Sequence, residues 1–352
     1  MPRMSNVNIA IIGAGMAGLK AANTLHRIGV NVTVFEKSRG LGGRLASRRT
    51  EFGHFNHGAQ YVTARDPGFN AFLQEATEFK VAQNWSPNLH RGSGATGSAA
   101  TGTNDTLSPI ARHVGNLAEE QWYQGAPQMN KLIRPLVDTF PIQKQHRIVG
   151  IEPVNQRSFM LHDDLDGSFG QFDGVIVTAP APQTADLLRP LAPRFGPIDE
   201  VVMAPCWAVM AAFEKPLPPG FDAMLYPSAE ISWAARSSQS DDALHRRTPD
   251  AWVLHASPEW SRAHLEDDKE RVIEKLLEAL RTASGVKLPE LHSVQAHRWR
   301  YARTEVPLGM SHLNGMNGRV IAAGDWCLGA RVEAAWRSGR SAAHSMIETL
   351  LG

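Results

Sequence analysis

Residues 8–44 read NIAIIGAGMAGLKAANTLHRIGVNVTVFEKSRGLGGR and decide the fold class. Residues 8–12 are apolar after Asn8, which predicts a parallel strand covered on both faces. A GxGxxG motif follows and comprises Gly13, Gly15 and Gly18, with Met16 and Ala17 among the residues between them. Apolar residues then recur at helical spacing, and residues 30–35 predict a second strand. This strand–helix–strand unit is typical of dinucleotide-binding domains, in which N–H groups at the helix start face a pyrophosphate.

An acidic residue, Glu36, ends the predicted second strand, and Lys37 follows it. A carboxylate at this place is positioned to bond with a ribose 2′-hydroxyl and would repel a 2′-phosphate. We therefore expect an adenine dinucleotide without that phosphate, either NAD or FAD. We include both residues in the predicted cofactor site.

A second glycine turn, Gly42-Gly43-Arg44, distinguishes between these two cofactors. It would bring backbone and a guanidinium group to the phosphates of an extended FAD. The spacing from Glu36 to this turn resembles that of the amine-oxidase-like flavoproteins. The resemblance implies FAD, which we expect to be bound noncovalently.

Two later segments, residues 174–178 and 319–323, also predict short buried strands. We expect them to join the first strand in one sheet assembled from three parts of the chain. The predicted fold is α/β, with a Rossmann-like FAD-binding domain and an α+β substrate domain, as in amine oxidases and p-hydroxybenzoate hydroxylase. The FAD domain is predicted to comprise 1–72, 145–182 and 298–352, and the substrate domain 73–144 and 183–297.

Phrases along the whole chain resemble the renalase family. They are KSRGLGGRLASRR (37–49), GAQYVTARD (58–66), WAVMAAFE (207–214), SWAARSS (232–238), WVLHASPEWSR (252–262), AHRWRYA (296–302) and GDWCLGARVEAAWRSG (324–339). Ala330 and Ala334 stand where we expect glycine in the family's last motif. The resemblance implies an FAD enzyme that oxidises isomeric 2- and 6-dihydro-NAD(P) to NAD(P)+ and reduces O2 to H2O2.

The remaining cofactor residues follow from the same resemblance. They are Gly58, Ala59, Gln60, Tyr61, Val149, Asp325 and Val332. Asp325 would bind ribityl or phosphate oxygens. A terminal helix beginning at Val332 would point its free N–H groups at the flavin, where its dipole favours negative charge.

The predicted catalytic residues are aromatic or imidazole groups that lie in these phrases. They are Tyr61, Trp233, His255, Trp299 and Tyr301. Hydride transfer from an electron-rich ring to flavin N5 depends mainly on stacking and orientation, so we expect these side chains to line the isoalloxazine. Core packing is the alternative interpretation for each of them.

Three arginines are candidates for the phosphates of a dinucleotide substrate: Arg236, Arg298 and Arg300. Solvated surface arginines are the alternative interpretation. No metal site is expected, because His54 and His57 stand between glycines and no third ligand is suggested.

Composition excludes several other classes of protein. The formal net charge of +1 gives no electrostatic case for a nucleic-acid or membrane-surface partner. No apolar run reaches the roughly 20 residues that span a bilayer. We expect a cytoplasmic protein with two reduced thiols, Cys206 and Cys327. The expected partners of the protein are a small dinucleotide substrate and O2, and the oligomeric state stays open. The Gly- and Ser-rich residues 92–109 predict a surface loop or lid.

Two alternatives remain open at the sequence level. A true amine oxidase often places a lysine near flavin N5, but the only lysines after residue 215 are Lys269, Lys275 and Lys287, none of them in AHRWRYA. A non-catalytic carrier built on this fold is the second alternative, and retention of Gly42-Gly43-Arg44 and Asp325 argues against it.

Overall fold

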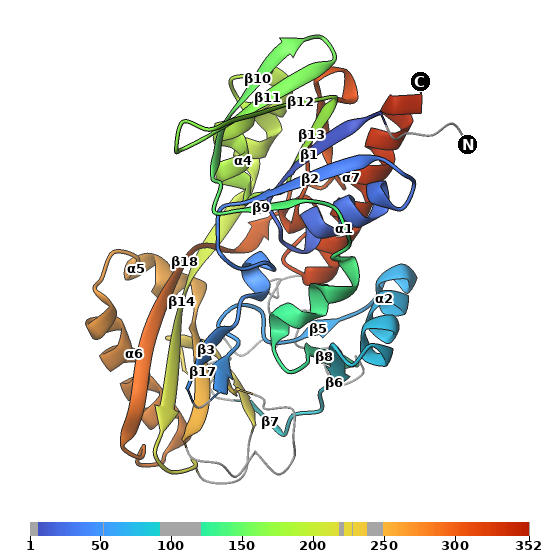
Figure 1. Cartoon of the computed structure of the whole chain (residues 1–352). Helices are drawn as coiled ribbons and strands as arrows, with labels where there is room; N and C mark the ends of the chain where they lie inside the picture. The colour runs from blue at the N-terminus through green and yellow to red at the C-terminus, as the bar shows by residue number, and fades with distance from the viewer. Residues whose placement is uncertain are drawn as a thin grey trace, which may run out of the picture.

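The computed structural model describes residues 6–51, 53–91, 121–217, 222–226, 228–237 and 249–351. Residues 92–109, predicted as a loop or lid, lie outside this part of the chain. A mainly parallel sheet and both chain ends form one half of the molecule, and a large antiparallel sheet forms the other half (Figure 1). The mixed α/β two-domain prediction is confirmed.

The mainly parallel sheet has the strand order β19-β20-β13-β1-β2-β9. Its strands are β1 (Asn8–Ile12), β2 (Asn31–Glu36), β9 (Ile142–Lys144), β13 (Gly174–Val177), β19 (Leu313–Gly315) and β20 (Val320–Ala322). All adjacent strands are parallel except β19, which runs antiparallel to β20. The three predicted strand ends therefore meet in one sheet.

Alternate residues of β1 explain why its four buried residues, 9–12, are all apolar. Ile9 and Ile11 belong to the hydrophobic cluster of the helical layer, whereas Ala10 and Ile12 belong to the cluster on the opposite face. Because side chains of a strand alternate between the two faces, a strand covered on both sides needs an apolar residue at every position.

The two faces of this sheet are covered by different elements. Helices α1 (Met16–His26) and α7 (Val332–Leu351) pack together on one face. The other face is covered by α4 (Ala181–Leu188) and a three-stranded sheet. The strands of that small sheet are β10 (Ile148–Asn155), β11 (Ser158–Asp163) and β12 (Ser168–Phe172).

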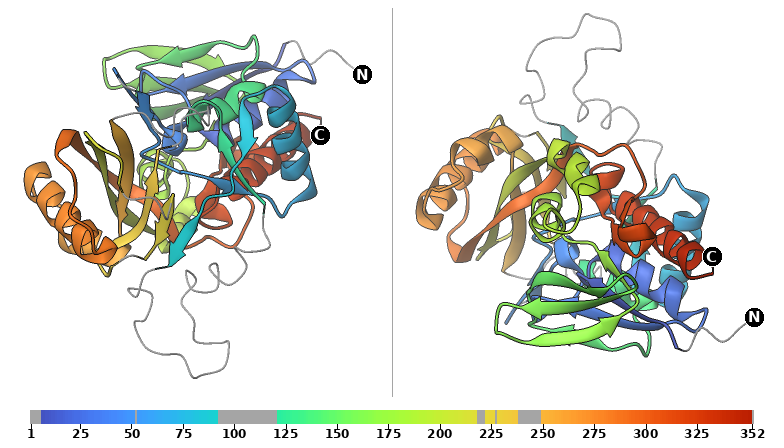
Figure 2. Two further views of the ribbon diagram at one scale, coloured as in Figure 1. Left: turned by 90° about the horizontal axis from the view of Figure 1, so that it is seen from below. Right: turned by 90° about the horizontal axis from the view of Figure 1, so that it is seen from above.

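The antiparallel half is a six-stranded sheet in the order β18-β14-β17-β16-β15-β7, in which β7 alone pairs in parallel with its neighbour. Its strands are β7 (Leu89–Arg91), β14 (Val202–Phe213), β15 (Ala223–Leu225), β16 (Ile231–Arg236), β17 (Asp250–Ala256) and β18 (Leu291–Val306). Helices α5 (Pro258–Ala263) and α6 (Lys269–Ser284) lie on its outer side (Figure 2). Helix α6 is amphipathic and buries Val272, Leu276 and Leu280.

The remaining elements lie outside the sheets and helices named above. They are η1 (Gly43–Leu45), β3 (Arg48–Thr50), β4 (Gly53–Phe55), β5 (Val62–Thr63), α2 (Pro67–Glu78), β6 (Ala82–Asn84), β8 (Trp122–Gly125), η3 (Met129–Leu136), η4 (Pro193–Glu200), η6 (Met316–Gly318) and η7 (Asp325–Cys327).

The observed packing differs from the predicted division in two places. Leu73, Met129 and Leu132 lie in the same hydrophobic cluster as β1 and α1, although residues 73–144 were predicted to belong to the substrate domain. The apolar faces of α2 and η3 are buried against the FAD-domain helices, a contact that local periodicity does not reveal. The predicted boundary at residue 298 also falls inside β18, which pairs with β14 on both sides of that point.

Candidate active site

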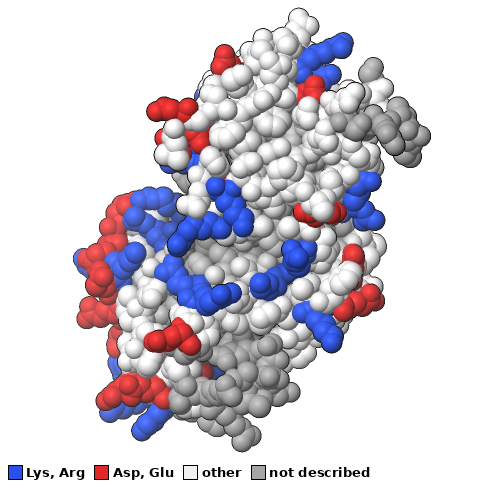
Figure 3. All heavy atoms as spheres, in the orientation of Figure 1, with Lys and Arg blue, Asp and Glu red and all other residues white. Residues whose placement is uncertain are grey.

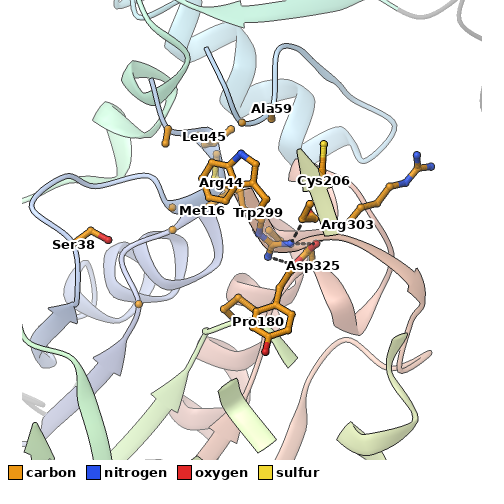
Figure 4. A pocket seen from close by; sticks show the side chains of 18 of the residues that line it. Met16, Ser38, Arg44, Leu45, Ala59, Pro180, Cys206, Trp299, Arg303 and Asp325 are labelled. Carbon is orange, nitrogen blue, oxygen red and sulfur yellow. Dashed lines mark hydrogen bonds and ion pairs between the residues drawn. The ribbon is translucent and has the colours of Figure 1, made fainter. Parts of the chain in front are cut away.

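A cavity of about 1660 Å³ lies where the two halves meet. Every predicted catalytic residue lines it: Tyr61, Trp233, His255, Trp299 and Tyr301. The predicted cofactor residues that line it are Gly13, Gly15, Met16, Ala17, Glu36, Lys37, Gly43, Arg44, Gly58, Ala59, Gln60, Tyr61, Val149, Asp325 and Val332. Figure 4 shows how the N-terminal turns, β18 and the loop before α7 contribute side chains to this one space. The fold thus unites residues from both ends of the chain.

The turn between β1 and α1 has the form of a phosphate cradle. A Cβ atom at Gly15 would meet no atom within 4 Å, so the missing side chain leaves room at the cavity wall. Helix α1 starts with no side-chain cap and no acidic residue in its first turn. Its N–H groups and its dipole therefore suit an anion, and the site fits the pyrophosphate of FAD.

Gly13 and Gly18 act through packing. Gly13 has φ +106°, and a Cβ there would lie 2.7 Å from Thr178 Oγ1. A Cβ at Gly18 would overlap the carbonyl oxygen of Gly13. Gly18 does not line the cavity, so its effect on the cofactor is indirect: it lets α1 approach the turn closely.

Glu36, at the end of β2, is 7% exposed and stabilises the phosphate cradle by hydrogen bonds. Its Oε2 accepts a hydrogen bond from the Ala14 N–H at 2.9 Å, and its Oε1 accepts one from the Ser38 N–H at 2.8 Å. Each carboxylate oxygen can accept a second bond. Glu36 is therefore equipped to receive ribose hydroxyls while it holds the two turns in place.

Arg44 and Asp325, each predicted to bind the cofactor, pair with each other. Arg44 Nη1 donates to Asp325 Oδ2 at 2.8 Å, and Nη2 donates to Oδ1 in a second bond (Figure 4). Thr304 Oγ1 also donates to Oδ2, at 3.2 Å. This bidentate pair ties the second glycine turn to β18 and to the loop before α7. Sequence analysis did not predict the contact, because the two residues are far apart along the chain.

A wall of aromatic and imidazole rings is organised around the backbone carbonyl of His57. That oxygen accepts hydrogen bonds from Trp299 Nε1 at 3.0 Å and from His255 Nε2 at 3.1 Å. The His57 ring also stacks on Trp299, with 5.4 Å between ring centroids. Two of the five predicted catalytic side chains are thus oriented by one main-chain atom.

A second group of rings fixes the position of Tyr61. Tyr61 stacks on Trp122 with 4.3 Å between centroids and lies 5.3 Å from Trp233. Trp233 Nε1 donates to Gln60 Oε1 at 3.0 Å. Since an indole N–H can only donate, this bond also fixes which way the Gln60 amide faces. The rings therefore have one packed arrangement on this side of the cavity.

Burial keeps two of the histidines neutral. It lowers the pKa of His255 to about 4 and, with smaller contributions from His297 and Arg48, lowers the pKa of His57 to about 3. Both imidazoles are therefore uncharged at neutral pH. They can orient neighbouring groups by hydrogen bonding and stacking, and they add no charge to the cavity.

These lowered pKa values predict an acid-sensitive fold. Below about pH 6.5, His57 and His255 are protonated in the unfolded chain but stay neutral in the folded protein. Their contribution to the free energy of unfolding is therefore fully present above that pH and is lost as the pH falls. We expect the free energy of unfolding to fall by up to about 1.4 kcal/mol per pH unit for each histidine. Urea titrations at pH 7, 6 and 5 measure this slope. In the His57→Asn variant the slope should be shallower; an unchanged slope would contradict the assignment to His57.

The three arginines predicted for substrate phosphates are placed differently from one another. Arg298 and Arg300 line the edge of the cavity, and each pairs with Glu266 at 2.7 Å. Arg236 does not line the cavity: its Nε lies 3.0 Å from Asp250 Oδ1, and its guanidinium packs over Trp252. We therefore withdraw Arg236, whose charge balances a buried aspartate of the neighbouring strand.

Positive charge surrounds the cavity. Ten lysine and arginine residues line it against three carboxylates, Glu36, Asp186 and Asp325. Lys and Arg side chains border the hollow in the middle of the face drawn in Figure 3. A nearly neutral chain has thus gathered an excess of cations at one place, which favours anionic ligands there.

Tyr226 and Arg303 are among the polar lining residues that sequence analysis missed. Arg303 follows AHRWRYA directly and lies on β18 with Trp299 and Tyr301. Its place beside that phrase could have indicated it. For Tyr226, in the loop after β15, the sequence carried no comparable signal.

The two cysteines are free thiols, and burial raises the pKa of each to about 12. Within the described residues, no group of three or more His, Cys, Asp or Glu side chains could hold a metal ion. No described helix is long and apolar enough to cross a membrane.

Comparison with known protein families assigns the chain. Residues 11–76 match the NAD(P)-binding Rossmann-like domain. Residues 141–347, more than half of the chain, match the flavin containing amine oxidoreductases. The chain belongs to the flavin containing amine oxidoreductase family. Its cofactor is FAD, as the two glycine turns predict.

Individual relatives of this flavoprotein match only in part. It is 34% identical over 85 residues to protoporphyrinogen oxidase 2, chloroplastic/mitochondrial, of Arabidopsis thaliana, and 40% identical over 67 residues to carotenoid phi-ring synthase of Streptomyces griseus. These matches cover 23% and 19% of this chain but only 17% and 12% of the relatives.

Solved structures match over nearly the whole flavoprotein. A protein described as a protoporphyrinogen oxidase from Exiguobacterium sp. 255-15 has a TM-score of 0.74 at 17% identity, over 99% of this chain and 100% of that one. A redesigned putrescine oxidase has a TM-score of 0.69 at 16% identity, over 97% of this chain and 99% of that one. At these identities the likeness shows the fold alone.

Proposed function

We propose that this flavoprotein is a renalase-like oxidase that converts 2- and 6-dihydro isomers of NAD(P) into NAD(P)+ and reduces O2 to H2O2. The observation that carries the proposal is a cavity that combines a ring-lined wall with ten cationic side chains against three carboxylates. An electron-rich heterocycle that carries phosphates matches both properties. The resemblance of the sequence phrases to the renalase family supports the same assignment.

The chemistry asks little acid–base work of the protein. FAD held in the cradle would supply the hydride-accepting chemistry, with O2 as the oxidant that completes the cycle. The chain's own residues orient the substrate ring. Trp299 and His255 are held in place by hydrogen bonds to the His57 carbonyl, and Tyr61 is held by stacking on Trp122. A substrate ring seated against this rigid wall has little orientational freedom left to lose before reaction.

Charge and lysine content argue against amine substrates. Amines are cationic at neutral pH, and the cation-rich lining would repel them. The only lysine among the described lining residues is Lys37, which lies beside Glu36 near the cradle and not on the ring-lined wall. The FAD assignment argues against a flavin-free carrier. Cys327 is buried and outside the lining, which supports noncovalent attachment.

Anaerobic stopped-flow absorbance tests the proposal directly. The purified holoprotein is mixed with 6-dihydro-NAD, 2-dihydro-NAD, ordinary NADH, putrescine and protoporphyrinogen IX, and the oxidised flavin bands are followed. We expect rapid bleaching by a 2- or 6-dihydro isomer, with little bleaching by NADH or putrescine. Bleaching by putrescine or protoporphyrinogen IX alone would overturn the proposal.

A further inference from the structure

We propose that Arg303 and Tyr226 form the subsite that binds the pyrophosphate of the dinucleotide substrate. This inference rests on the proposed function and replaces the arginines that the sequence suggested. Both residues line the cavity, and neither belongs to the FAD cradle of the β1–α1 turn. The argument depends on charge, on donor geometry and on a backbone conformation.

Arg303 is the arginine of β18 whose charge remains available to bind an anionic ligand. Arg298 and Arg300, on the same strand, are both paired with Glu266. Arg303 is half-buried and forms no ion pair with a carboxylate of the described residues. In Figure 4 its side chain extends beside Cys206 and away from the Arg44–Asp325 pair. A guanidinium in that position can bind an anion with two parallel N–H bonds.

Tyr226 supplies a second donor at the same point. The Arg303 guanidinium lies close enough to the Tyr226 hydroxyl to interact with it, and since a guanidinium can only donate, the phenol oxygen is the acceptor in that contact. Burial raises the pKa of Tyr226, so its hydroxyl stays protonated. The phenol proton is then free to point at the anion that Arg303 holds. Two donors therefore converge on one place in the cavity.

The backbone of Tyr226 indicates that this placement is specific. Tyr226 has φ +48°, the left-handed region that bulky residues rarely adopt. Its N–H donates to the Ser232 carbonyl at 3.0 Å and closes the loop between β15 and β16. Such a conformation persists only where surrounding contacts maintain it, and it is common at ligand sites.

Flavin reduction by 6-dihydro-NAD tests the subsite in Arg303→Met, Arg303→Lys and Tyr226→Phe holoproteins. We expect the half-saturating concentration to rise about 10- to 100-fold in Arg303→Met, and less in the other two, with the saturating rate within about threefold of wild type. With 6-dihydronicotinamide riboside, which lacks phosphate, Arg303→Met should differ little from wild type. Arg262→Met is the matched control, because Arg262 pairs with Glu305 and lies outside the lining.

The outcomes separate this inference from the proposed function. A wild-type flavin that no dihydro isomer reduces would overturn both. A wild type that is reduced normally, with an unchanged half-saturating concentration in Arg303→Met, would overturn the subsite alone. So would a larger effect of Arg300→Met than of Arg303→Met, or an equal effect on the riboside substrate.

Discussion

Replacing Gly339 with alanine is expected to lower the free energy of unfolding by about 3 kcal/mol and to weaken FAD retention. Gly339 lies inside α7, where alanine would normally stabilise the helix by about 1 kcal/mol. Here a Cβ would overlap the Ala17 carbonyl oxygen and lie 2.9 Å from the Ala17 Cα. The obstacle is backbone, so the two helices must move apart. Ala17 lines the cavity, and the movement would disturb the cradle that holds the cofactor.

Urea denaturation at a fixed, saturating FAD concentration measures the stability, and flavin absorbance after gel filtration measures retention. Gly196→Ala is the matched control, because Gly196 is exposed and a Cβ there would meet nothing within 4 Å. We expect the control to stay within about 0.5 kcal/mol of wild type. A Gly339→Ala protein as stable as Gly196→Ala would contradict the close approach of α1 and α7.

Arg44→Met is expected to destabilise the fold by about 3 kcal/mol, because it leaves a buried carboxylate without its partner cation. Asp325 is 6% exposed, and Thr304 is the hydroxyl donor that would remain. The variant should also lose flavin, since the second glycine turn is no longer tied to the loop before α7. Chemical denaturation and flavin content are the two measurements.

The double variant Arg44→Met with Asp325→Asn distinguishes loss of the pair from loss of either residue alone. Once Asp325→Asn has removed the buried charge, Arg44→Met should lower the free energy of unfolding much less than it does in the wild-type background. The effects of the two single substitutions on that free energy should therefore not be additive. Strictly additive effects would show that the pair contributes no coupling.

Local features of the sequence sufficed for the nucleotide-binding unit. The GxGxxG turn, Glu36 and Gly43-Arg44 lie within one short segment, and their conformations follow from glycine stereochemistry and helix geometry. The site residues named from whole phrases, such as Trp299 and His255, also line the cavity. The resemblance of these phrases to the renalase family is what placed residues far apart along the chain at one site.

What the sequence by itself determined was the fold class, the FAD cradle and a set of cavity-lining residues from both ends of the chain. Only the tertiary structure decided which groups are already paired: Arg44 with Asp325, Arg298 and Arg300 with Glu266, and Arg236 with Asp250. It also decided that α2 and η3 pack with the FAD domain. The physical reason is the distance along the chain over which each kind of interaction acts. Strand and turn signals come from neighbours in sequence, whereas charge pairing and packing depend on contacts between segments that only the folded chain brings together.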